Sequence, residues 1–178
     1  MSIVSKAPDA ERIVLSELTS DDAPFILELL NEPDWLRFIG DRGVHDLDCA
    51  RAYIEKVQTE MYDRLGFGLY KVSLKDGNIP LGLCGLLKRD TLPDTDIGFA
   101  FLLRHRGYGY AYEAAGAILD LGLHVLGLKR ILAITDPANV RSIRLLHKLD
   151  FRFLGRLHLE DHSSDSNLYE YWPVSLSR

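Results

Sequence analysis

Cysteine is scarce in this sequence of 178 residues, which contains only Cys49 and Cys84. The two have neither the spacing of metal ligands nor the density of a disulfide framework, and a reducing cytoplasm suits both. An excess of positive charge is also missing, because 21 Lys and Arg stand against 26 Asp and Glu, for a formal net charge of -5. A surface that binds polyanions needs a basic face, so we expect no nucleic-acid partner.

Long hydrophobic runs are absent as well. The first residues lack an apolar stretch behind a basic start, and no later segment approaches the roughly 18 uninterrupted apolar residues of a membrane span. We therefore expect no membrane partner and a cytoplasmic location. With 47% hydrophobic and 26% charged residues, the chain fits one globular domain at residues 11–178, behind a flexible leader at residues 1–10.

Apolar periodicity divides the domain into strands and helices. Ser20 caps a first helix, which Pro33 interrupts. The pair Asp76-Gly77 favours the positive backbone angles of a tight hairpin turn. Strands are predicted over residues 12–18, 67–74, 80–87, 96–103, 130–135, 151–159 and 168–174, and further helices over 47–64, 110–126 and 139–149. Because hairpins and crossovers coexist, strand pairing must be mixed and the fold class is α/β.

The most informative motif is a glycine turn between the strand at 96–103 and the helix at 110–126. It reads Arg104-His105-Arg106-Gly107-Tyr108-Gly109. A strand that enters a helix through such a turn directs unpaired backbone N–H groups and the positive end of the helix dipole at one point, which attracts phosphate. Glycines let a ligand approach the main chain, and two arginines can add charge. The turn by itself is equally compatible with a plain strand-to-helix connection.

This motif resembles the signature of the GNAT acetyltransferases, which is Gln or Arg, any two residues, Gly, any one residue, then Gly or Ala. The matching positions are Arg104, Gly107 and Gly109. The continuation at 109–114, and Asn139 with Ser142 ahead of residues 148–151, resemble the RimJ/RimL-like branch of ribosomal-protein N-terminal acetyltransferases. The resemblance implies a GNAT fold: a mixed, strongly twisted sheet of about seven strands flanked by helices and splayed between the fourth and fifth strands. Acetyl-CoA would enter that splay.

The resemblance also implies which residues bind the cofactor. Main-chain amides of residues 105–110 would hold the pyrophosphate, main-chain groups of Phe101 and Leu102 would meet the pantetheine and thioester, and Asn139 would contact the pantetheine. The cofactor-binding residues expected in this way are Phe101, Leu102, Arg104, His105, Arg106, Gly107, Tyr108, Gly109, Tyr110, Asn139 and Ser142.

Two residues are candidates for the chemistry. Attack on a thioester requires a neutral amine and hence a proton acceptor near it, directly or through one water. Asp96 stands where the branch often has Glu and is the leading general base, the alternative being a solvated aspartate at a strand end. Ser142 could protonate the departing thiolate or only solvate the helix start. Many GNAT enzymes carry a tyrosine acid where this sequence has Leu146, and Asp150 replaces the family's usual glycine.

The remaining polar candidates give weaker signals. His158, Asp161 and His162 fall at a strand end and in a polar loop, and we expect no metal there. Residues 31–41 are rich in aromatic and polar groups, where the fold would bind an acceptor, although core packing also accounts for Trp35 and Phe38.

Two functions fit the sequence. The first is an N-acetyltransferase that moves an acetyl group from acetyl-CoA to a primary amine, either of a small molecule or of a protein N-terminus. The second is a non-catalytic acyl-CoA sensor or interaction module that kept the cofactor turn. The resemblance also allows a homodimer, and the identity of the acceptor stays open because a fold does not fix a substrate.

Overall fold

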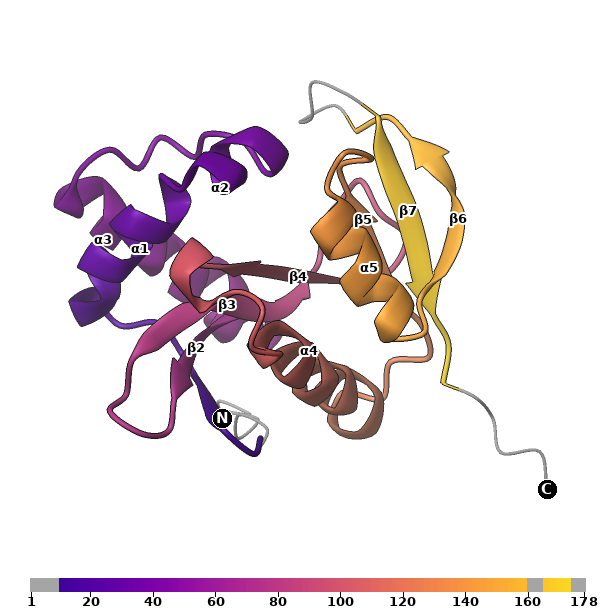
Figure 1. The fold of residues 1–178 in the computed structure, drawn as a ribbon, viewed down its shortest axis with the longest axis horizontal. Coiled ribbons are helices and arrows are strands. Elements are labelled where there is room, and N and C mark those ends of the chain that lie inside the picture. The colour runs from indigo at the N-terminus through magenta and orange to yellow at the C-terminus, as the bar shows by residue number, and fades with distance from the viewer. Residues whose placement is uncertain (1–9, 160–164, 174–178) are drawn as a thin grey trace.

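The computed structural model describes residues 10–159 and 165–173, whose strands form one sheet in the order β1-β2-β3-β4-β5-β7-β6 (Figure 1). The strands are β1 (Ile13–Ser16), β2 (Leu69–Leu74), β3 (Pro80–Leu87), β4 (Asp96–Phe101), β5 (Ile131–Thr135), β6 (Arg152–Leu157) and β7 (Ser166–Tyr171). The α-helices are α1 (Ala23–Leu30), α2 (Pro33–Phe38), α3 (Leu47–Val57), α4 (Tyr110–Asp120) and α5 (Val140–Lys148). Residues 1–9 of the expected leader and Val174 of the last expected strand lie outside the described residues.

Every predicted strand is present, with ends that shift by a few residues. All neighbouring pairs are antiparallel except β4 with β5, which are parallel, so the prediction of a mixed α/β sheet is confirmed. In the hairpin between β2 and β3, positive φ falls on Gly77 and Asn78 rather than on Asp76. The turn type is therefore as expected, one residue later than predicted.

The sheet opens between β4 and β5. These two strands are in register at a single pair, Asp96 opposite Leu132, next to the bond from the Leu132 amide to the Thr95 carbonyl at 2.9 Å. Figure 1 shows β1–β4 with α1–α3 forming one half of the molecule, and β5–β7 with α5 forming the other. The splay expected between the fourth and fifth strands is present.

The helices differ from the prediction in three ways. Ser20 does not cap α1: it is the first residue of a 3-10 turn, Ser20–Asp22, whose N-cap is Thr19, and Asp22 stands at the N-cap of α1. Pro33 does not interrupt a helix: α1 ends at Leu30, and Pro33 begins α2, where its fixed φ and missing N–H suit a first helical turn. The two long predicted helices have their expected extent but finish as π-helical turns, Gln58–Asp63 after α3 and Leu121–Val125 after α4.

Opposite faces of the sheet carry α3 and α4. Alternation along β3 places Leu83 and Leu87 on one face and Leu86 on the other. Leu83 and Leu87 line a cavity together with Tyr53 of α3. On the other face, a Cβ added at Gly122, in the π turn after α4, would lie 3.3 Å from Leu86. The glycine there allows the helix end to approach the sheet closely.

Candidate active site

The turn between β4 and α4 has the backbone that a ligand cradle requires. Gly107 and Gly109 adopt φ of +88° and +85°, the left-handed region that favours glycine. Gly109 is the N-cap of α4 and offers no side-chain cap, so the first amides of the helix have no capping partner among the described residues. A Cβ at Gly107 would meet nothing within 4 Å. The turn thus leaves open space beside backbone donors at the positive end of a helix dipole.

Arg12, just before β1, holds this turn in place. Its Nη1 donates to the Tyr108 carbonyl at 3.0 Å, and its Nε donates to Glu113 at 2.9 Å. Its guanidinium also lies over the Tyr110 ring, 4.8 Å from the centroid. No local pattern predicts this role, because Arg12 lies 96 residues before Tyr108 in the chain.

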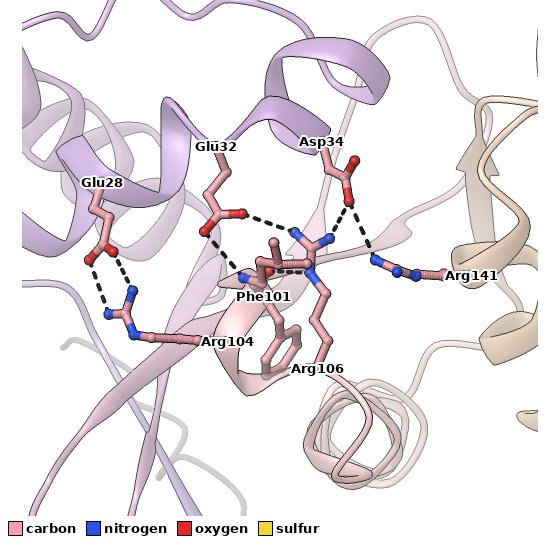
Figure 2. A network of polar contacts seen from close by, with 8 residues as sticks. Glu28, Glu32, Asp34, Phe101, Arg104, Arg106 and Arg141 are labelled. Atoms are coloured by element: carbon pink, nitrogen blue, oxygen red, sulfur yellow. Dashed lines mark hydrogen bonds and ion pairs between the residues drawn. The ribbon is translucent and has the colours of Figure 1, made fainter.

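The two arginines of the turn are neutralised by carboxylates of the N-terminal helices (Figure 2). Arg104 forms a two-pronged ion pair with Glu28, which lowers the pKa of that carboxyl chiefly through the hydrogen bond. Arg106 pairs with Asp34 and, at 3.4 Å, with Glu32. Neither guanidinium is free to contribute its full charge to a phosphate, and the main chain of the turn is left as the principal donor.

Arg106 also forms a hydrogen bond to the end of β4. Its Nε donates to the Phe101 carbonyl at 2.7 Å, while Glu32 accepts from the Leu103 amide at 3.2 Å. Asp34 then reaches across to Arg141 of α5 at 3.6 Å (Figure 2). The network therefore links α2 and the turn, on one side of the splay, to α5 on the other side.

Two cavities meet at the splay. The turn cavity, about 860 Å³, is walled by the 103–112 turn, α2 and α5. The Asp96 cavity, about 630 Å³, is walled by α3, β4, β5 and the loop at 39–44. Both are lined by the same seven residues: Trp35, Phe38, Ile39, Phe99, Ala100, Asn139 and Ser142. A ligand that passes along this shared wall would extend from the glycine turn toward Asp96.

Eight of the expected cofactor residues line the turn cavity and three do not. Those that line it are Phe101, His105, Arg106, Gly107, Gly109, Tyr110, Asn139 and Ser142. Arg104 is directed to Glu28 instead, and Tyr108 is exposed outside the cavity. The Leu102 amide donates to the Leu81 carbonyl, and its carbonyl accepts from the His105 amide, both at 2.9 Å. Leu102 therefore has no main-chain N–H left for a ligand.

The main-chain groups of Phe99 are directed as those of Leu102 were expected to be. Backbone groups of a strand alternate between its two neighbours, so the bond from Leu102 to β3 turns the groups of Phe101 and Phe99 toward the splay. Phe99 also lines both cavities. The sequence could have revealed it only if the pairing partners of β4 had been known.

Asn139 and Ser142 occupy the start of α5. The Asn139 side chain accepts from the Ser142 amide at 3.2 Å and thereby caps the N-terminus of α5. Both residues lie in the wall that the two cavities share. Ser142 is thus positioned between the glycine turn and Asp96.

Asp96 is a buried carboxylate and not a solvated one. Its side chain is fully buried at the first position of β4 and lines the Asp96 cavity. Arg89 Nε lies 3.1 Å from both carboxylate oxygens. Burial raises the pKa of Asp96 to about 6, and the neighbouring Arg89 opposes that rise. A carboxylate with such a pKa can accept a proton near neutral pH, which is the property that a general base needs.

The two departures from the family pattern have different consequences. Leu146 is buried on α5, where it cannot serve as an acid. Asp150 adopts φ of +64°, as expected for a residue that replaces glycine after a helix. The turn into β6 is therefore preserved without the glycine.

From the sequence we also expect no metal site and no membrane-spanning segment. Within residues 10–159 and 165–173, no three His, Cys, Asp or Glu side chains gather as a metal site, while Asp161 and His162 lie outside that part of the chain. No helix of the described part is long and apolar enough to cross a bilayer.

A glycine turn at a helix start opens into a cavity beside a splayed parallel strand pair, and its backbone donors suit a phosphate-bearing ligand. A model of the acetyltransferase (GNAT) domain matches residues 12–152. The "uncharacterized N-acetyltransferase p20" of Bacillus licheniformis is 27% identical over 148 residues, 83% of each chain. YkkB of Bacillus subtilis is 31% identical over 137 residues, 75% of this chain and 77% of that protein.

Solved structures show the same fold. A GNAT-family acetyltransferase from Bacillus anthracis superposes with a TM-score of 0.77 at 25% identity, covering 93% of this chain and 97% of that one. RimL, a ribosomal L7/L12 alpha-N-protein acetyltransferase solved in complex with coenzyme A, gives a TM-score of 0.75 at 15% identity, covering 93% and 97%. The chain belongs to the GNAT acetyltransferase family.

Proposed function

We propose that this protein transfers an acetyl group from acetyl-CoA to a primary amine, which attacks the thioester directly in a ternary complex. The observation that carries the proposal is the shared wall of the two cavities, because it places Asp96 and the glycine turn along one path. The uncapped amides of the turn fit a pyrophosphate. RimL, solved with coenzyme A, and the family match support acetyl-CoA as the donor.

Each polar residue has a role in this proposal. Asp96 accepts the proton that the amine loses, directly or through one water, as the nitrogen bonds to the acetyl carbon. Main-chain N–H groups of β4 that face the splay stabilise the charge on the thioester oxygen. Ser142 donates a proton to the sulfur as the carbon–sulfur bond breaks. The products are an N-acetylated amine and free CoA.

The acceptor is a small-molecule amine or a protein N-terminus. RimL is a ribosomal L7/L12 alpha-N-protein acetyltransferase, which supports a protein N-terminus as one of the two acceptor classes. The test is to incubate the protein with acetyl-CoA and a panel of amines, peptides and aminoglycosides, and to measure CoA release. We expect at least one acceptor to release CoA well above the rate without acceptor.

The competing function is a sensor that binds acyl-CoA without turnover. Leu146 in place of a tyrosine acid favours it, as does the pairing of Asp96 with Arg89. Binding of acetyl-CoA in a calorimeter, combined with no transfer to any member of the panel, would replace the enzyme by the sensor. Absence of acetyl-CoA binding would overturn both.

A further inference from the structure

One face of α5 carries a row of cations into the turn cavity. Arg141, Arg144 and Lys148 are spaced by three and four residues, which places them on the same side of the helix. All three line the turn cavity opposite the glycine turn. The protein as a whole has a formal net charge of -5, so this row stands out from the general composition.

The charges of this cavity do not cancel. Its lining holds two carboxylates, Glu32 and Asp34, and Arg106 pairs with both. Asp34 also pairs with Arg141. Arg144 and Lys148 remain, and neither has an ion pair with a carboxylate of the described residues. The cavity therefore keeps two uncompensated positive charges, both on α5.

An aromatic side chain helps to orient one of these cations. Lys148 Nζ lies over the ring of Tyr112, 4.5 Å from its centroid, and Tyr112 also lines the cavity. A cation over an aromatic face is attracted to it and keeps its charge and its outward N–H donors for another partner. The contact holds Lys148 between α4 and α5 instead of leaving it extended into solvent.

We infer that Arg144 and Lys148 bind the 3′-phosphate of the CoA nucleotide, so that the protein selects the 3′-phosphorylated donor. The inference rests on the proposed function. CoA carries a pyrophosphate and, on its ribose, a separate phosphate dianion. The glycine turn suits the pyrophosphate, and the two free cations of α5 suit the second anion in the same cavity.

The test compares CoA with 3′-dephospho-CoA by calorimetry at about 0.1 M salt. The wild-type protein binds CoA about tenfold more tightly, which corresponds to about 1.4 kcal/mol. In the double variant R144Q/K148Q, the affinity for CoA falls by about tenfold and the affinity for dephospho-CoA changes less than about twofold. The variant R144K/K148R keeps the preference, because it keeps both charges.

The matched control is K129Q/R152Q, which removes two exposed charges that line neither cavity. It retains the wild-type preference. Equal affinity of the wild type for the two ligands, or a preference that survives in R144Q/K148Q, overturns the inference and leaves the proposed function standing. Failure of the wild type to bind either ligand overturns both.

Discussion

Replacing Asp96 by Asn is the most direct test of the proposed chemistry. General bases contribute on the order of 10² to 10⁴ in rate, so we expect kcat/KM at pH 8 to fall at least about 100-fold. The pKa of Asp96 is about 6, and the wild-type kcat/KM decreases as the pH falls through that value because the base becomes protonated. This decrease is the acidic limb of the pH profile, and D96N lacks it. The assay is CoA release between pH 5 and pH 9 with the best acceptor of the panel.

The same pKa predicts a change in stability with a definite sign. The pKa is raised from 3.8 in the unfolded chain to about 6 in the buried site, so the native state binds the proton more tightly. The free energy of unfolding therefore falls as the pH rises from about 4 to about 6, by up to about 3 kcal/mol. Urea unfolding at pH 4 and pH 7 measures this step, which D96N lacks.

The matched control is D94N, which removes a neighbouring carboxylate that pairs with Arg130 and lines neither cavity. It keeps the acidic limb and most of kcat/KM, and both variants keep the wild-type affinity for acetyl-CoA. The assignment of Asp96 as base is refuted if D96N retains kcat/KM within about threefold together with the limb near pH 6.

Three further changes test the rest of the site. G107A forces an alanine into φ of +88° and lowers the affinity for acetyl-CoA at least about tenfold in calorimetry, whereas G127A, at φ of +69° with the same open surroundings, costs similar stability but keeps the affinity. An equal loss of acetyl-CoA affinity in both variants would mean that backbone strain alone causes the loss. S142A lowers kcat about tenfold without changing the affinity for acetyl-CoA, and an unchanged kcat would remove Ser142 as the acid. R106Q removes the donor to the Phe101 carbonyl and lowers the free energy of unfolding in urea by about 2 kcal/mol. R104Q removes an ion pair that is about half exposed and changes this free energy by less than about 1 kcal/mol. Similar losses in the two variants would contradict the role given to Arg106 in the network.

Features with local causes could be predicted from the sequence. The strand, glycine turn and helix at residues 96–126 follow from apolar spacing and from glycines that permit positive φ. The Asn139 cap and the left-handed Asp150 depend in the same way on a few neighbouring residues. Pro33 also has a local cause. A proline can stand at the start of a helix or just after its end, and the spacing of the residues that follow decides which of the two applies.

Features that depend on distant partners could not be predicted. Arg104 matched the family signature, yet it pairs with Glu28, which lies 76 residues earlier in the chain. Leu102 was expected to present main-chain groups, but its amide is bonded to β3, and the register of β3 with β4 decides which residues face the splay. The sequence left open whether Asp96 is a general base or a solvated aspartate, because its burial and its ion pair with Arg89 depend on the hairpin of β3 and β4.

The turn cavity and the Asp96 cavity, which we propose to bind the donor and the acceptor, are joined through α2. Trp35 and Phe38 of α2 line both cavities, and Asp34, one residue before Trp35, is held by Arg106 of the turn and by Arg141 of α5. Because Arg106 also bonds the Phe101 carbonyl at the end of β4, a displacement of its guanidinium would disturb the turn, the strand end and the start of α2 together. Substitutions in this network are therefore expected to change donor and acceptor binding jointly, whereas Gly107 and Asp96 affect one side each.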